Sequence, residues 1–180
     1  MKNNSIKVLV AEGSSLGNNP NYIKAARDVG KIIADKGYGY VQGGCARGLM
    51  GETLNEFAKY SDDITVVIPK CYSSDLSGMK YKKAYKVKTI QDRLEKFMEL
   101  SHIAIALPGA FGTMHEILTY IETHRGKEQP IKIIIVNIDG YFDNLIMQFE
   151  RMINDGLLAK GKLSQYFTVV KDVKSIKKLI

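Results

Sequence analysis

The stretch of sequence that most strongly indicates chemistry is Leu107–Glu116, which is rich in glycine and lies between an apolar run and an amphipathic one. Gly109 and Gly112 leave the backbone uncovered, and Thr113 adds a hydroxyl where a helix is expected to begin. Backbone N–H groups and the positive end of a helix dipole together form a cradle for an anion. We therefore predict a phosphate-binding loop made of Gly109, Ala110, Phe111, Gly112 and Thr113.

Glu116 lies three residues after Thr113, and this spacing leaves two interpretations open. Thr-x-x-Glu is the pattern of a capping box, in which both side chains bond to backbone N–H groups of their own helix. Alternatively, a carboxylate one turn inside a phosphate-binding helix faces the ligand. In that position it would activate water or stabilise a developing cation.

Two further small-residue loops follow expected strands. Gly43 and Gly44 come after one strand and just before a helix, so their backbone can approach a ligand closely. The loop Glu12–Gly17 contributes Ser14, with a hydroxyl and an N–H group. A dinucleotide fingerprint would need an acidic residue at the end of the next strand, whereas Asp62 and Asp63 precede that strand, which disfavours NAD.

Apolar runs that would form buried parallel strands alternate with amphipathic stretches that would form helices. We predict strands at Ile6–Ala11, Tyr38–Gln42, Ile64–Ile68, Ile103–Leu107 and Ile131–Asn137, with weaker candidates at Tyr85–Thr89 and Tyr166–Val170. We predict helices at about 20–36, 48–60, 90–101, 113–124, 141–155 and 173–179. This order predicts a Rossmann-like, doubly wound α/β fold with a parallel sheet of about seven strands. A single domain over residues 1–180 accounts for the whole pattern.

Composition excludes several classes of function. The net charge is +7, but the lysine clusters at 70–88 and 171–178 do not show the aromatic pattern of an RNA-stacking sheet, and no zinc finger or basic zipper appears, so we expect no nucleic-acid partner. The three histidines have no metal spacing, and we expect no metal. Two cysteines do not make a disulfide framework, no apolar run approaches the ~20 residues of a membrane span, and no signal peptide is recognisable. We therefore expect a cytoplasmic protein without a membrane partner.

The glycine loops also carry a resemblance to a known family. Residues 108–116 resemble the PGGxGTxxE signature of the LOG (Lonely Guy) family, cytokinin riboside 5′-monophosphate phosphoribohydrolases that are often mislabelled as lysine decarboxylases. Arg93, 15 residues before the proline, takes the place of the family's upstream arginine. Gly43–Gly51 is similar to the GGGxxGLMG motif, Gly13–Ser15 to the N-terminal Gly-Ser loop, and Val136–Phe142 to an N-x-D-G-Y-Y segment.

The resemblance implies a homodimer or larger homo-oligomer, no metal or redox cofactor, and a catalytic pair formed by Arg93 and Glu116. An arginine beside Glu116 would keep that carboxylate ionised at neutral pH. Nothing in the local sequence singles out Arg93, which would otherwise be a surface residue paired with Asp92, Glu95 or Glu99. The phosphate and ribose would be held by Ser14, Gly43, Gly44, Gly109, Ala110, Phe111, Gly112 and Thr113.

The implied activity is hydrolysis of a nucleoside 5′-monophosphate to free base and ribose 5-phosphate, with a purine or cytokinin nucleotide as first choice. Ala110, Cys45 and Leu94 depart from the family's motifs. His115 and Glu122 stand at positions where plant-type members carry Glu and a substrate-binding Thr, so both are candidates for the base side. Two alternatives stay open: hydrolysis of a pyrimidine nucleotide such as CMP or hydroxymethyl-CMP, and a nucleotide-binding sensor without catalysis.

Overall fold

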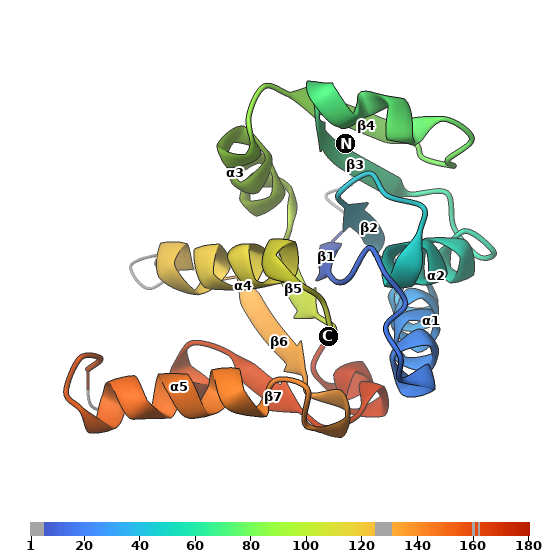
Figure 1. Ribbon diagram of the computed structural model, residues 1–180. Coiled ribbons are helices and arrows are strands. Elements are labelled where there is room, and N and C mark those ends of the chain that lie inside the picture. The colour runs from blue at the N-terminus through green and yellow to red at the C-terminus, as the bar shows by residue number, and fades with distance from the viewer. Residues whose placement is uncertain (1–5, 125–130, 160, 162) are drawn as a thin grey trace.

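The structure is a computed structural model that describes residues 6–124, 131–159, 161 and 163–180. Seven parallel strands form one sheet in the order β4-β3-β2-β1-β5-β6-β7 (Figure 1). The strands are β1 (Lys7–Ala11), β2 (Gly39–Gln42), β3 (Ile64–Pro69), β4 (Lys83–Val87), β5 (Ile103–Ala106), β6 (Lys132–Val136) and β7 (Thr168–Val170). The α-helices are α1 (Pro20–Asp35), α2 (Gly48–Phe57), α3 (Ile90–Leu100), α4 (Phe111–His124) and α5 (Asp143–Asn154). This confirms the predicted doubly wound α/β fold.

The strand order reverses direction between β1 and β5. From β1 the chain proceeds outward to β4, returns to β5 beside β1, and then proceeds the other way to β7. Val8 pairs with Ile103 and Ala11 with Ala106, so the two strands end level with each other. Because ligands of open α/β sheets bind beyond the carboxyl ends of the strands at such a reversal, the loops after β1 and β5 mark the expected site.

Helices cover both faces of the sheet, and each face has its own apolar core. In Figure 1, α1 and α2 lie on one side of the sheet and α3, α4 and α5 on the other. Successive residues of β1 point into opposite cores. Val8 and Val10 pack on the side of α1 and α2, and Leu9 packs on the side of α3, α4 and α5. This burial on both faces explains why the strands are apolar throughout instead of alternating.

Local signals set the positions of several helices. The Asn19 side chain accepts a hydrogen bond from the backbone N–H of Asn21, and Pro20 occupies the first turn of α1, as predicted. Gly30 lies in the middle of α1 because a Cβ there would come 2.5 Å from the carbonyl oxygen of Thr53. This close approach joins α1 to α2.

The structure also corrects some element boundaries. The edge strand predicted at Tyr85–Thr89 lies at Lys83–Val87, and the last helix is a 3-10 helix, Val173–Lys178, capped by Asp172. Another 3-10 helix, Lys70–Leu76, was not predicted. Helix α4 begins at Phe111 rather than 113, which places Thr113 inside its first turn.

Candidate active site

A cavity of about 220 Å³ opens where β1 and β5 end. Loops and helices from both faces of the sheet contribute to it, so the cavity lies at the reversal of the strand order. It is lined by Leu9, Val10, Glu12, Gly13, Ser14, Gly43, Cys45, Met50, Arg93, Phe97, Ala110, Gly112, Thr113 and Glu116.

Three glycine-rich loops meet at this cavity through backbone contacts. The N–H of Gly13 donates to the carbonyl of Pro108 at 3.0 Å, and the carbonyl of Gly13 accepts from the N–H of Met50 at 3.2 Å. A Cβ on Gly109 would lie 2.1 Å from Thr113 Oγ1 and 2.8 Å from the Gly13 nitrogen, so only glycine fits there. The loops after β1 and β5 are therefore packed directly against each other.

The 136–142 segment supports the loop after β5 from outside. The Tyr141 hydroxyl donates to the Gly109 carbonyl at 2.6 Å, and the Tyr141 ring packs edge-on against Tyr22 of α1. Asn137 holds the turn by accepting from the N–H of Phe142 at 2.7 Å. The segment that resembles a family motif thus positions the loop.

The first turn of α4 presents its N–H end to the cavity. Gly112 is exposed, and a Cβ there would meet no atom within 4 Å, so the fold itself does not require glycine at this position. Thr113 is only 3% exposed and Phe111 is 92% exposed. An uncovered backbone at a helix N-terminus is suited to an anionic ligand.

Arg93 and Glu116 form an ion pair on the α3–α4 side of the cavity. Arg93 Nη1 donates to Glu116 Oε1 at 3.0 Å, while Arg93 Nε donates to the carbonyl of Val67 at 3.2 Å. The guanidinium also lies over the Phe97 ring, 4.6 Å from its centre. Glu116 therefore bonds to Arg93 rather than completing a capping box with Thr113.

The helix that carries Arg93 begins at a capping box of its own. The Thr89 hydroxyl accepts from the N–H of Asp92 at 3.0 Å, and the Asp92 carboxylate accepts from the N–H of Thr89 at 3.1 Å. This box fixes where α3 starts and so which face carries Arg93. Arg93 points into the cavity instead of pairing with acidic residues of its own helix.

Gly43 makes room for this arginine. A Cβ at Gly43 would lie 1.8 Å from Arg93 Nη2, so any side chain there would displace the guanidinium. Gly44 has φ of +82°, a conformation that favours glycine, and the N–H groups of Gly44 and Cys45 donate to Gln42 Oε1. The double glycine thus positions Arg93 as well as exposing backbone.

Two opposed influences act on the pKa of Glu116. Burial raises the pKa of Glu116 and is the largest influence, while the charge of Arg93 and its hydrogen bond lower it. The net direction is upward from the ordinary value of 4.5. Arg93 therefore offsets part of the effect of desolvation on this carboxyl, and its role in keeping Glu116 ionised stays a prediction.

A second carboxyl, that of Glu12, lines the same cavity and is not among the predicted site residues. The only signal for it in the sequence is an acidic residue at the end of a buried strand, which is unusual. Glu12 is 6% exposed and accepts hydrogen bonds from the hydroxyls of Thr53 at 2.8 Å and Tyr40 at 3.3 Å. No local signal connects residues 12, 40 and 53, which meet only in the fold.

Most of the predicted site residues meet in this cavity. Those that line it are Ser14, Gly43, Arg93, Ala110, Gly112, Thr113 and Glu116. Gly44 and Gly109 lie in the adjoining loops, and Phe111 projects outward. His115 and Glu122 are exposed on α4, and Glu122 borders a separate apolar groove between α4 and α5. Their role on the base side stays a prediction.

Within the described ranges, no three His, Cys, Asp or Glu side chains are grouped so as to hold a metal ion. Among the residues that the structure describes, no helix is both long enough and apolar enough to span a membrane.

Comparison with known proteins identifies the family of this chain. A family model described as "possible lysine decarboxylase" matches residues 42–180. The chain belongs to this family, the LOG family. The sequence resemblance is thereby confirmed.

Curated relatives within the LOG family carry specific names. The probable cytokinin riboside 5′-monophosphate phosphoribohydrolase LOG4 of Oryza sativa subsp. japonica is 29% identical over 147 residues, which is 81% of this chain and 64% of the relative. The corresponding LOG5 enzyme of Arabidopsis thaliana is 27% identical over 84% of this chain and 67% of its own length. The match thus spans slightly less than two thirds of the rice relative.

Solved structures share the fold at lower identity. The Moco carrier protein of Chlamydomonas reinhardtii superposes with a TM-score of 0.70 at 14% identity, covering 97% of both chains. The molybdenum cofactor binding protein of Rippkaea orientalis has a TM-score of 0.68 at 16% identity, covering 97% of this chain and 93% of that one. At these identities the likeness establishes the fold alone.

Proposed function

We propose that this LOG-family chain hydrolyses the N-glycosidic bond of a nucleoside 5′-monophosphate, releasing the free base and ribose 5-phosphate. The observation that carries the proposal is the Arg93–Glu116 ion pair, buried in the same cavity as the glycine loop that begins α4. The names of the curated relatives support the same reaction class.

In this proposal the 5′-phosphate binds at the N-terminal end of α4, on the backbone of Gly109–Thr113, with Ser14 and the double glycine beside it. Anchoring the phosphate fixes the ribose and holds its C1′ atom near the Glu116 carboxylate. The cavity, about 220 Å³, is smaller than the ~300–1,000 Å³ of a typical ligand pocket. It accommodates the phosphoribosyl part, and the base extends through the open side.

The reaction then follows the logic of glycoside hydrolysis. The C1′–N bond breaks through an oxocarbenium-like state, and the base leaves with the bonding electrons and gains a proton. Water adds to C1′ and loses a proton. Glu116 stabilises the positive ring or accepts the proton of the water, and Arg93 holds Glu116 in place and contacts the ribose or phosphate.

The base itself is the finer part of the proposal. A purine or cytokinin nucleotide is the first choice, because the curated relatives are named for cytokinin riboside 5′-monophosphates. A pyrimidine nucleotide, CMP or hydroxymethyl-CMP, is the alternative. Cys45 and Ala110, both on the cavity wall, put side chains where the family's motifs have glycine, and this difference in the wall is compatible with a different base.

The test is product analysis with a panel of nucleotides: AMP, an N6-prenylated AMP, CMP, GMP, UMP and IMP. We expect free base and ribose 5-phosphate from at least one of them. Glu116→Gln should lower that turnover by a factor of about 10² or more, because it removes the charged oxygen near C1′. Glu99→Gln, which changes an exposed glutamate on α3, is the matched control. Near-normal turnover by Glu116→Gln would refute the assigned mechanism.

A second candidate is a nucleotide-binding sensor or carrier without catalysis. Two proteins of the same fold are a Moco carrier protein and a molybdenum cofactor binding protein, and Leu94 and Ala110 depart from the hydrolase motifs. Measurable nucleotide binding with no product from any member of the panel would favour this function.

We further propose that the protein is a cytoplasmic homodimer or larger homo-oligomer. Cys45 and Cys71 are free thiols, which suits a reducing compartment, and the family resemblance implies the assembly. Cell fractionation and light scattering test these two statements.

A further inference from the structure

Glu12 is a buried carboxyl that the mechanism above leaves unused. It directly follows β1, lines the same cavity as Glu116, and precedes Gly13, whose N–H bonds to the Pro108 carbonyl in the loop after β5. Glu12 lies two residues before Ser14, which is proposed to lie beside the phosphate. Its charge therefore bears directly on the binding of an anion.

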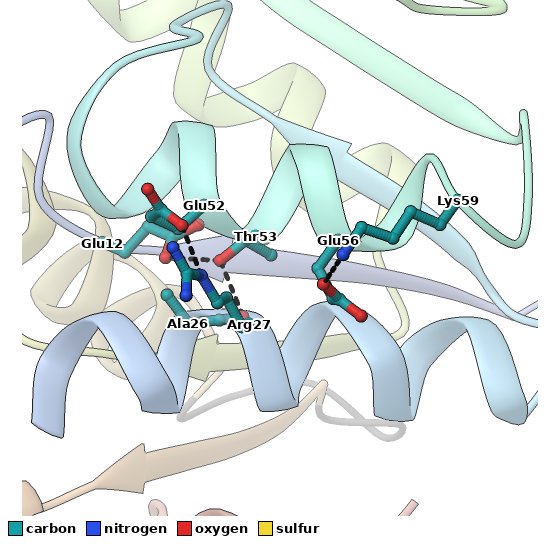
Figure 2. A network of polar contacts seen from close by, with 7 residues as sticks. All are labelled: Glu12, Ala26, Arg27, Glu52, Thr53, Glu56 and Lys59. Carbon is teal, nitrogen blue, oxygen red and sulfur yellow. Dashed lines mark hydrogen bonds and ion pairs between the residues drawn. The ribbon is translucent and has the colours of Figure 1, made fainter.

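The partners of Glu12 are hydroxyls and not cations. Figure 2 shows Thr53, on α2, between Glu12 and the backbone of α1 at Ala26. Tyr40 of β2 donates to the other carboxyl oxygen at 3.3 Å. Among the residues that the structure describes, no cation bonds to Glu12, and the nearby Arg27 is paired with Glu52 at 2.6 Å.

The number of hydrogens available favours a neutral Glu12. The Thr53 hydroxyl has one hydrogen, and two oxygens lie within bonding distance of it, Glu12 Oε2 at 2.8 Å and the Ala26 carbonyl at 3.2 Å. A carbonyl only accepts. A protonated Glu12 donates to Thr53, which then donates to Ala26, so all three oxygens are satisfied. An ionised Glu12 takes the only hydrogen and leaves the Ala26 contact unmade.

Helix packing keeps water away from this group. Gly30 lets α1 approach the Thr53 carbonyl so closely that no side chain would fit between the two helices. The pKa of Glu12 is raised to about 8, mainly by burial and in smaller part by the charge of Glu116, although the hydrogen bonds from Thr53 and Tyr40 act in the opposite direction.

We propose that Glu12 controls the affinity of the cavity for its phosphate ligand through its own protonation, and that the neutral form of Glu12 binds the ligand. The inference rests on the proposed function only for the nature of the ligand.

The charges that face Glu12 explain why. Glu116 from α4 and Arg93 from α3 neutralise each other, Tyr40 faces it from β2, and Cys45 lies on the cavity wall after β2. Thr53 and the α1 backbone carry no charge. With Glu12 neutral, the charges of Arg93 and Glu116 cancel and the cavity has no net charge from these groups. An ionised Glu12 adds one negative charge, which repels a phosphate.

The experiment is a calorimetric titration with ribose 5-phosphate at about pH 7 and about pH 9. The phosphate is close to fully dianionic at both values, so the ligand keeps its charge. We expect the wild-type dissociation constant to rise at least about tenfold at the higher pH, as one added charge in a partly desolvated cavity requires. In Glu12→Gln the ratio of the two constants should stay near one. Circular dichroism at each pH checks that the protein is folded.

Two control variants separate Glu12 from its neighbours. Glu52→Gln changes an adjacent glutamate outside the cavity, and Cys45→Ala removes the thiol on the cavity wall; both should keep the wild-type ratio. If Glu12→Gln does not fold, Tyr40→Phe replaces it, because loss of that donor raises the pKa of Glu12. The loss of affinity should then move to higher pH.

The outcomes distinguish this inference from the proposed function. The role of Glu12 would be overturned if the dissociation constant of the wild type were nearly the same at both pH values. It would also be overturned if Glu12→Gln lost as much affinity at the higher pH as the wild type does. Either result would leave the phosphate site intact. Loss of the pH dependence in Cys45→Ala would assign it to the thiol instead. Absence of ribose 5-phosphate binding at either pH would contradict the phosphate site and with it both proposals.

Discussion

Glu12 and Glu116 are the same residue type, border the same cavity and are buried to the same degree, at 6% and 7% exposed. They differ in the elements behind them. Glu116 meets an arginine from α3 at 3.0 Å, whereas Glu12 meets only hydroxyls, from β2 and α2. One side of the cavity thus provides a counter-charge, and the other provides hydrogen-bond partners alone.

This difference shows that burial by itself does not decide how a carboxyl behaves. Desolvation raises the pKa of both groups, but for Glu116 the charge and hydrogen bond of Arg93 act against it. Hydroxyls stabilise an ionised carboxyl less than a guanidinium does, so Glu12 retains its proton to about pH 8. Two carboxyls in one cavity therefore suit an ionised role and a neutral role respectively.

The strongest way to break the comparison is Arg93→Met, which leaves Glu116 without a cation, like Glu12. We expect the unfolding free energy to fall by about 3–5 kcal/mol, because a buried ion pair loses one partner. The pKa of Glu116 should rise further, and turnover should fall with it. Chemical denaturation and product assays measure both effects. Arg93→Lys keeps the charge but not the planar fork that also reaches Val67, so it should be intermediate. Unchanged stability and turnover in Arg93→Met would show that the pair is dispensable.

A smaller change should come from Gly43→Ala, which keeps Arg93 but moves it. The added Cβ would lie 1.8 Å from Nη2, so the guanidinium must leave its place beside Glu116. We expect turnover to fall about 10- to 100-fold through misplacement. Stability should fall less than in Arg93→Met, because the displaced arginine keeps its charge near Glu116. Gly112→Ala is the matched control for the fold, since its Cβ would meet no atom within 4 Å. Normal turnover in Gly43→Ala would mean that the position of Arg93 is not critical.

The smallest effect sharpens the Glu12 side of the comparison through stability. The folded protein holds a proton on Glu12 up to about pH 8, while the unfolded chain releases it near pH 4.5. The contribution of Glu12 to stability is therefore complete below pH 4.5 and declines as the pH rises toward 8. Between about pH 6 and pH 8 the stability of wild type relative to Glu12→Gln should fall by about 2 kcal/mol. Denaturant titrations at several pH values measure it, and a constant difference would mean that Glu12 is already ionised when folded.

Much of the fold could be predicted from residues close together in sequence. Apolar runs on both sides of amphipathic stretches predicted a parallel sheet, and Asn19-Pro20 marked the start of α1, because burial on two faces and helix capping leave local patterns. The edge strand β4 was placed two residues late because an edge strand is covered less fully and its pattern is weaker. The start of α4 at Phe111 was missed because Gly112 looked like loop sequence.

The candidate site divides in the same way. The sequence alone predicted a phosphate loop at 109–113 and singled out Glu116, since glycines at a helix start carry their chemistry in their spacing. Only the tertiary structure decided which groups meet Glu116 and Glu12: Arg93 held in place by the bare backbone of Gly43, and Thr53 brought to Glu12 by the close approach of α1 to α2 at Gly30. These contacts join residues more than twenty positions apart. No local pattern encodes them, because their geometry depends on how the helices pack across the sheet.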